Sequence, residues 1–210
     1  MSLAAATRGP ALGLVLGLAA GLAAGPALAT IADPQADDMA LGNPKAKVTV
    51  IEYASVGCPH CADWNRDVFP GLRAKYVDKG KVRFVLRELT TGDAAVAAAG
   101  FMLARCAGPA KYFDVVEDIY RRQSEMYAAG QTRGTVLEDI ARSEGLSDDA
   151  FKDCIDSQPN LDALNARVAR HVDQDKVTST PTFFVNGRPL GDNDALGDFD
   201  KAIAAASRRR

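Results

Sequence analysis

A strand, a helix and a second strand follow one another directly in the first half of this chain, and this order constrains the fold more than any other feature. Residues 47–54 (KVTVIEYA) and residues 81–89 (KVRFVLREL) have the β-branched, alternating pattern of strands. Between them, apolar side chains recur at helical spacing, namely Trp64, Val68, Leu72 and Tyr76. A helix that connects two strands in this way makes them parallel, with a right-handed crossover. The sequence therefore predicts a βαβ unit in an α/β domain.

The chain changes character after this unit. Residues 91–175 contain several helical segments separated by glycine-containing turns. Residues 180–190 (TPTFFVNGRPL) then predict a strand, an Asn-Gly turn and a return strand, and a last helix follows over about 195–207. We therefore predict one α/β domain, formed by residues 45–90 and 176–207, with an all-helical subdomain inserted at 91–175 and an extended N-terminal arm at 30–44.

The first 29 residues have the organisation of a secretory signal peptide. Arg8 precedes an apolar run over residues 11–24, and the segment ends in Ala27-Leu28-Ala29. The apolar run has 14 residues, whereas a membrane span needs about 20. We expect cleavage near Thr30 and a periplasmic location, with an uncleaved membrane anchor as the alternative. Cysteines in such an oxidising compartment tend to form disulfides.

Composition excludes some function classes. The chain is 47% hydrophobic and 25% charged, which is ordinary for a globular protein, and its formal net charge is -2. The sequence therefore gives no sign of a strongly basic surface of the kind that would indicate a nucleic-acid partner.

Two of the four cysteines lie in the motif Cys58-Pro59-His60-Cys61, where the first strand gives way to the helix. Cys58 is placed to cap this helix, and Pro59 occupies the first helical position, where a missing N–H costs nothing. The positive end of the helix dipole favours a thiolate at Cys58, and a His60 imidazolium would favour it further. Cys61 lies one turn into the helix and is expected to be more buried. A stabilised thiolate makes the Cys58–Cys61 disulfide a stronger oxidant.

Other functions for the cysteines fit less well. A closed zinc site needs four ligands, but the remaining cysteines are single and distant, and His171 is expected on a helix surface. We therefore expect no metal and no cofactor. A purely structural Cys58–Cys61 disulfide would be strained and labile. Cys106 and Cys154 both lie in the helical insertion, where we expect a structural disulfide, with two buried free cysteines as the alternative.

CPHC after a strand, the inserted helices and Thr180-Pro181 before TFFVNG together resemble the DsbA family of thioredoxin-fold thiol–disulfide oxidoreductases, over about residues 45–205. The resemblance implies that Cys58 is the exposed nucleophile and Cys61 the resolving thiol, and that Pro59 and His60 set the redox poise. It also implies a cis-proline loop at Thr180-Pro181, which faces the motif and binds a client segment by strand-like pairing.

Two further positions follow from this resemblance. Glu52 matches the acidic residue that family members carry beneath the active site, where it assists proton transfer for Cys61; the alternative is a solvated strand residue. Thr180 before the proline resembles the isomerase branch and some Gram-positive oxidases, which leaves the potential and the client preference open. The chain has no room for the dimerisation domain of dimeric isomerases, so we expect a monomer.

The sequence thus predicts an exported dithiol oxidase that donates its Cys58–Cys61 disulfide to folding secreted proteins. Its implied partners are reduced or misfolded secreted clients and a membrane quinone-linked reoxidase. A disulfide isomerase or reductase of the same fold is the first alternative. The second, of a different class, is a periplasmic chaperone or binding module in which the CxxC motif is incidental.

Overall fold

The computed structural model describes residues 1, 31, 35–191 and 195–208, and the structural statements below refer to these residues. The predicted signal peptide at residues 1–29 lies outside them, apart from Met1. Within the described part of the chain, no helix combines the length and the apolar character needed to cross a membrane.

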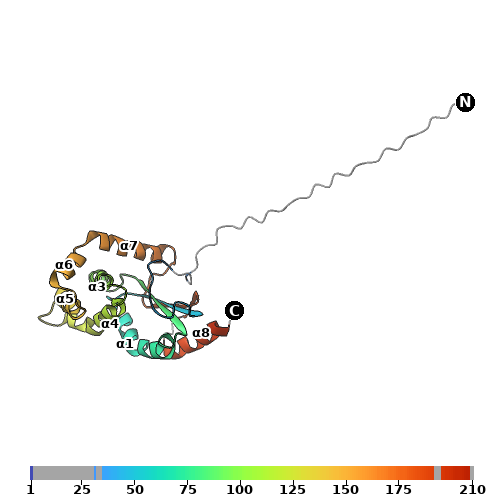
Figure 1. The fold of residues 1–210 in the computed structure, drawn as a ribbon, viewed down its shortest axis with the longest axis horizontal. Helices are drawn as coiled ribbons and strands as arrows, with labels where there is room; N and C mark the ends of the chain where they lie inside the picture. The colour runs from blue at the N-terminus through green and yellow to red at the C-terminus, as the bar shows by residue number, and fades with distance from the viewer. Residues whose placement is uncertain (2–30, 32–34, 192–194, 209–210) are drawn as a thin grey trace.

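A five-stranded sheet with the order β1-β3-β2-β4-β5 forms the centre of the molecule (Figure 1). The central strands β2 and β3 are parallel, as expected for the βαβ unit, and the other neighbouring strands are antiparallel. Most side chains of β2 and β3 are buried, because helices cover both faces of these strands, and the buried side chains include the charged residues Glu52, Arg87 and Glu88. The strands are β1 (Met39–Gly42), β2 (Val48–Ala54), β3 (Val82–Glu88), β4 (Thr182–Val185) and β5 (Arg188–Pro189).

Two observations extend the predicted strand pattern. Strand β1 lies within residues 30–44, so part of the predicted arm belongs to the sheet. Its register pairs Met39 with Leu86 on β3. At the other edge, Asn186 and Gly187 have φ values of 47° and 74° between β4 and β5. A tight hairpin turn requires positive φ at both central positions, so the predicted Asn-Gly turn is confirmed.

Helices cover both faces of the sheet. On one face Val168 and Val172 of α7 pack near Ile51 and Val85. On the other face α1 places Trp64 among aromatic rings of the strands and of α8, with its ring centroid 4.5 Å from that of Phe183. The helical segments of the βαβ unit and the C-terminus are α1 (Pro59–Asp67), α2 (Phe69–Leu72), the π-helical η1 (Arg73–Val77) and α8 (Leu196–Arg208).

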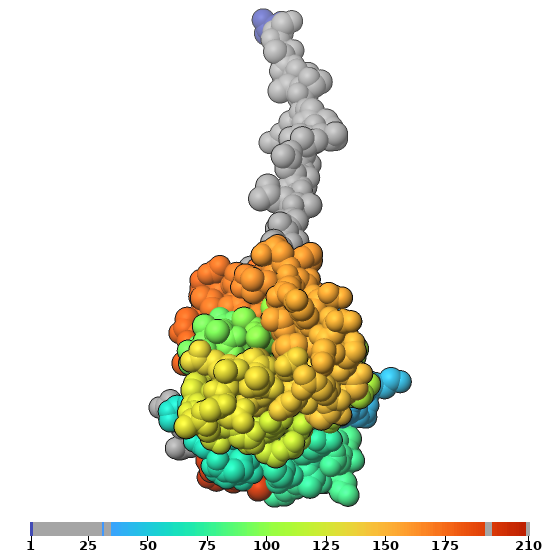
Figure 2. All heavy atoms as spheres, turned by 90° about the vertical axis from the view of Figure 1, so that its left-hand side faces the viewer, coloured from blue at the N-terminus to red at the C-terminus, as the bar shows by residue number. Residues whose placement is uncertain are grey.

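The remaining helices form the insertion, and Figure 2 shows them as a continuous surface that runs from green through yellow to orange. They lie between β3 and β4 in the sequence and pack on one another, while α4 also packs on α1 and α7 on β3. The structure is therefore the predicted α/β thioredoxin fold with an inserted helical subdomain. These helices are α3 (Ala94–Cys106), α4 (Tyr112–Arg122), the 3-10 helix η2 (Gln123–Tyr127), α5 (Arg133–Ser143), α6 (Asp148–Ile155) and α7 (Gln158–Asp173).

A buried carboxylate connects this insertion to the sheet. Glu88, at the end of β3, is 1% exposed. Its Oε1 accepts hydrogen bonds from Arg105 Nε at 2.7 Å and from the Tyr112 hydroxyl at 3.0 Å, and its Oε2 accepts one from Arg167. Because a buried charge must be paired to be tolerated, this cluster fixes α3, α4 and α7 relative to β3.

The expectation that His171 lies on a helix surface is wrong. Its side chain is 2% exposed, and its ring meets the Tyr53 ring edge to face, with centroids 5.5 Å apart. His171 Nδ1 lies 2.9 Å from the backbone oxygen of Glu88. Burial lowers the pKa of His171, which favours a neutral imidazole. The histidine therefore belongs to the packing of α7 against the sheet.

Candidate active site

The CPHC motif lies at the junction of β2 and α1, as predicted. Cys58 is the N-cap residue, with the extended dihedral angles φ -99° and ψ 120°, and Pro59 is the first residue of α1. The Cys58 backbone N–H donates to Ser55 O at 3.0 Å, and its carbonyl accepts from Ala62 N–H at 3.2 Å. These bonds fix Cys58 where the free N–H groups of the first helical turn point toward its sulfur.

The two thiols have opposite acidities. Both are free in this structure, which therefore corresponds to the dithiol form. The Cys61 thiol, the Thr180 hydroxyl and the backbone N–H groups of Cys61 and His60 hydrogen-bond to Cys58 and lower its pKa to about 5, against the effect of burial. The same bond to Cys58, burial and the charge of Glu52 raise the pKa of Cys61 well above its usual range. At neutral pH the pair therefore holds a thiolate at Cys58 and a thiol at Cys61.

One expectation for this motif needs correction. Cys58 is 6% exposed and Cys61 is fully buried, so the Cys58 thiol is far less exposed than expected. The Thr180-Pro181 loop accounts for this, because it lies directly against Cys58. The side chain of His60 is exposed, and its backbone N–H is among the groups that lower the pKa of Cys58.

The Thr180–Pro181 peptide bond is cis, as expected. The sulfur of Cys58 lies 3.6 Å from the Thr180 carbonyl oxygen, to which a protonated thiol donates. Strand β4 begins directly after this loop, and Thr182 pairs with Tyr53 on β2. The sheet therefore positions the loop opposite the first turn of α1, even though 122 positions separate Cys58 and Thr180 in the sequence.

A third segment completes the site, and the sequence analysis missed it. The loop between β3 and α3 places Thr91 between the two other loops: its carbonyl accepts a hydrogen bond from Ser55 Oγ at 2.8 Å, and its hydroxyl is hydrogen-bonded to the Thr180 hydroxyl. Asp93 N–H donates to Gly57 O at 3.0 Å. No periodic pattern marks Thr91, because it lies in a loop and all these partners are remote in the sequence.

Glu52 lies beneath the cysteines. It is in β2, where it pairs with Leu86 and Phe183, and it is 2% exposed. The alternative of a solvated strand residue is thus wrong. Its charge is one cause of the raised pKa of Cys61, so the carboxylate acts on the buried thiol of the pair.

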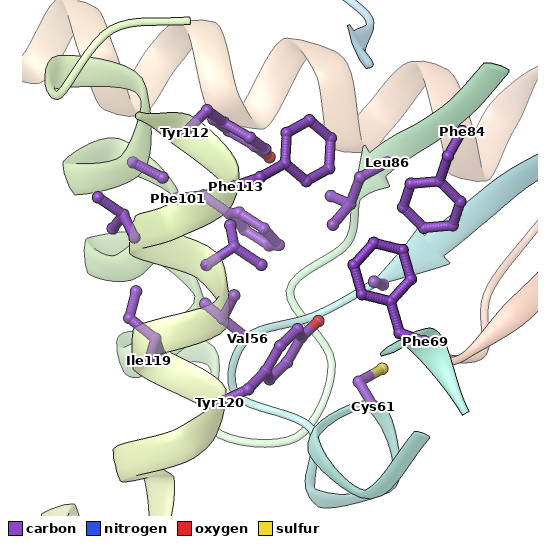
Figure 3. Close-up of a cluster of buried hydrophobic side chains, with 14 of the residues drawn as sticks. Val56, Cys61, Phe69, Phe84, Leu86, Phe101, Tyr112, Phe113, Ile119 and Tyr120 are labelled. Atoms are coloured by element: carbon purple, nitrogen blue, oxygen red, sulfur yellow. The ribbon is translucent and has the colours of Figure 1, made fainter. Parts of the chain in front are cut away.

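Tyr120 of α4 is a second residue that the sequence did not indicate for the site. Figure 3 shows its hydroxyl and the sulfur of Cys61 pointing into the same part of the core. The hydroxyl is buried and has no hydrogen-bond partner among the residues that the structure describes. Burial is the largest cause that raises the pKa of Tyr120 well above its usual value, so the hydroxyl is neutral at physiological pH.

Cys106 and Cys154 are joined by a disulfide, with their Cα atoms 6.3 Å apart. It connects the end of α3 to α6 within the helical insertion. Cys154 is 4% exposed. This bond belongs to the framework of the insertion and is separate from the Cys58–Cys61 pair.

Comparisons with known proteins agree with this geometry. The family described as "Thioredoxin" matches residues 35–205. A Rickettsia typhi protein named "Putative protein-disulfide oxidoreductase" is 34% identical over 170 residues, which are 81% of this chain and 62% of that protein. The "Disulfide bond formation protein D" of Bacillus subtilis is 28% identical over 77% of this chain and 72% of its own length. This chain thus spans about three fifths of the Rickettsia relative.

Among solved structures, the alpha-DsbA1 protein of Wolbachia pipientis superposes with a TM-score of 0.74 and 28% identity, covering 83% of this chain and 94% of that protein. Fold, site and relatives together define the class of thioredoxin-fold proteins that carry a CxxC motif at the start of the first helix. The chain belongs to the thioredoxin family and, within it, to the DsbA-type thiol–disulfide proteins.

Proposed function

We propose that this chain is a dithiol oxidase that transfers the Cys58–Cys61 disulfide to reduced client proteins. The observation that carries the proposal is the position of Cys58, which caps α1 and lies 3.6 Å from Thr180 O, where the Cys61 thiol and the Thr180 hydroxyl lower its pKa to about 5. A low thiol pKa stabilises the reduced enzyme, so the oxidised enzyme gives up its disulfide readily.

The transfer proceeds in two exchanges. A client thiolate attacks the sulfur of Cys58, the Cys58–Cys61 bond breaks, and Cys61 leaves with the electron pair and takes up a proton. A second client thiolate then attacks the client sulfur of the mixed disulfide, and Cys58 leaves as a thiolate. The client loses two electrons and gains a disulfide, and the enzyme gains both electrons as a dithiol.

The neighbouring residues have defined roles in this scheme. Glu52 supplies the proton to Cys61, because burial makes a thiolate there costly. Pro59 and His60 set the redox poise through the backbone of the first helical turn. The Thr180-Pro181 loop, which lies against Cys58, receives an extended client segment by backbone pairing, so it selects little by sequence.

The cellular setting follows from the same proposal. Residues 1–29 direct export to the periplasm, where the clients are reduced or misfolded secreted proteins and a membrane quinone-linked partner reoxidises the dithiol. Residues 45–90 and 176–207 act as the catalytic domain of a monomer, and residues 91–175 form the insertion that covers it.

A disulfide isomerase or reductase is the second candidate, because Thr180 precedes the cis-proline, as in the isomerase branch. The test uses two clients. Oxidised protein mixed with reduced, unfolded ribonuclease A should restore its activity, and Cys58→Ser should not. Rapid recovery of ribonuclease with scrambled disulfides by the dithiol form, without oxidation of the reduced client by the oxidised form, would instead establish the isomerase. Full client folding with Cys58→Ser would establish a chaperone or binding module.

A further inference from the structure

Thr91 is hydrogen-bonded to two loops of the site, the β2–α1 loop that leads to Cys58 and the Thr180-Pro181 loop. On one side its carbonyl oxygen accepts a hydrogen bond from the Ser55 hydroxyl at 2.8 Å. Ser55 Oγ in turn accepts a hydrogen bond at 3.2 Å from the backbone N–H of Gly57, the residue that precedes Cys58. On the other side its hydroxyl is bonded to that of Thr180.

The backbone around Thr91 cannot shift easily relative to Cys58. A Cβ atom on Gly57 would lie 2.2 Å from the Asp93 carbonyl oxygen, and a Cβ on Gly92 would lie 2.2 Å from the Gly57 carbonyl oxygen. Gly92 also has a φ of 70°, which glycine adopts without strain. The β2–α1 loop, which contains Gly57, and the β3–α3 loop, which contains Thr91 and Gly92, are therefore in direct backbone contact. The Asp93 side chain accepts hydrogen bonds from Ala95 and Val96 N–H and so fixes the end of the β3–α3 loop to the start of α3.

The chemistry of two neighbouring hydroxyls determines what this contact can do. Each hydroxyl carries one proton and can donate one hydrogen bond. If Thr180 donates to Thr91, its proton is unavailable to the Cys58 sulfur. If Thr91 donates to Thr180, the Thr180 proton is free to point at Cys58, and the donated bond polarises the Thr180 hydroxyl and strengthens that second bond.

We propose that Thr91 is a positioning residue for the redox reaction, which donates to the Thr180 hydroxyl and so directs its proton at the Cys58 sulfur. The inference deepens the proposed function and rests on Cys58 being the sulfur that forms the mixed disulfide with the client. Thr91 does not touch the reacting sulfur and acts only through Thr180. A thiolate that accepts the Thr180 bond is stabilised by this two-hydroxyl chain, whereas a disulfide sulfur gains little from it.

The test is a double-mutant cycle on the full chain with Thr91→Val and Thr180→Val, read out as the pKa of Cys58 from the ultraviolet absorbance of its thiolate. Thr91→Val keeps the shape of the side chain and removes the hydroxyl. We expect it to raise the Cys58 pKa by about half a unit, a change of about threefold in acid dissociation. The same factor of about threefold corresponds to a reduction potential about 14 mV more negative.

Two controls separate positioning from packing. Thr91→Ser keeps the hydroxyl and should retain the wild-type pKa, although it loses a methyl group. In the Thr180→Val background, Thr91→Val should have no further effect, because the group through which it acts is gone. Far-ultraviolet circular dichroism establishes that each variant is folded, and Thr91→Ala replaces Thr91→Val if the latter is not.

The outcomes are distinct. An unchanged pKa in Thr91→Val, or an equal increase with and without the Thr180 hydroxyl, would overturn the inference. A wild-type protein whose Cys58 lacks a low pKa would instead overturn the proposed function on which it rests. A raised pKa in Thr91→Val, restored in Thr91→Ser and absent from the Thr180→Val background, is the result that the structure predicts.

Discussion

The sulfur of Cys58 lies 3.6 Å from the carbonyl oxygen of Thr180, so the loop before the cis-proline touches the reactive thiol directly. Thr180 offers Cys58 both an acceptor and a donor: its carbonyl accepts a hydrogen bond from the protonated thiol, and its hydroxyl donates one to the thiolate. Since α1 adds its free N–H groups from the other side, the donors around the thiolate outweigh the nearby carbonyl oxygen and burial, and the pKa of Cys58 is lowered. Several measurable consequences depend on this arrangement.

The first concerns pH. The pKa of Cys58 is about 5 in the folded dithiol form and about 8.5 in an unfolded chain. The unfolded dithiol therefore binds more protons between these values, so the stability of the reduced protein relative to the oxidised one rises with pH across this window. We expect this gain in the free energy of unfolding of the reduced protein to be largest at about pH 8.5 and to vanish as the pH falls through about 5. Urea unfolding of both forms at several pH values measures it.

Cys61→Ala is a matched control for this effect, because the bond from Cys61 is the leading cause of the low Cys58 pKa. Hydrogen bonds to charged groups contribute about 1.5 to 3 kcal/mol, so we expect the Cys58 pKa to rise by about one unit or more. An unaltered thiolate titration in Cys61→Ala would show that the helix and Thr180 alone stabilise Cys58.

Glu52 should control the chemistry of the buried thiol. With Glu52→Gln the acid that protonates Cys61 is lost, and we expect disulfide transfer to slow at least about tenfold at neutral pH. The Cys58 pKa should change little, since Glu52 is not among its main causes. Stopped-flow reduction of the oxidised protein by a small client peptide measures the rate. Equal rates for wild type and variant would remove Glu52 from the mechanism.

Tyr120 and Tyr112 form a matched pair for stability. Both hydroxyls are buried in α4, but that of Tyr112 donates to Glu88 at 3.0 Å, whereas that of Tyr120 has no partner among the described residues. An unsatisfied buried polar group costs about 1 to 3 kcal/mol. Tyr120→Phe should therefore leave the free energy of unfolding unchanged or raise it by about 1 kcal/mol. Tyr112→Phe should lower it by about 1 to 3 kcal/mol, and the reverse order would contradict this interpretation.

The Cys106–Cys154 disulfide should stabilise the fold without affecting the site. It joins residues separated by 48 positions, for which the chain-entropy account gives at most about 4 kcal/mol. We expect the Cys106→Ser, Cys154→Ser double variant to unfold at lower urea concentration and to keep the wild-type thiolate titration of Cys58. A shifted titration would show that the insertion transmits strain to the active site.

The parts of the site that local sequence determines were predictable. Cys58 and Pro59 mark the start of a helix by themselves, because a cap and a first-position proline depend only on neighbouring residues. The facing Thr180-Pro181 loop was predicted only through the resemblance, since nothing near residue 180 indicates what lies opposite.

Other features depend on tertiary contacts and were missed or misjudged. Thr91 is 36 positions from Ser55 and 89 from Thr180, and a threonine in a loop carries no pattern that indicates such partners. His171 follows Arg170, and further polar residues come after Val172, so its inward orientation on α7 becomes visible only when α7 packs on Tyr53. The burial of Cys58 likewise depends on a loop from the far end of the chain.

The reduction potential of the Cys58–Cys61 pair tests the central claim most directly. Equilibration of the full chain with glutathione buffers, followed by quantification of the free dithiol, gives this potential. Because the site stabilises the Cys58 thiolate, we predict a value near the oxidising end, about -120 mV, which is the reference value for DsbA itself. A value near that of thioredoxin, about -270 mV, would contradict the account and assign the chain to reduction instead.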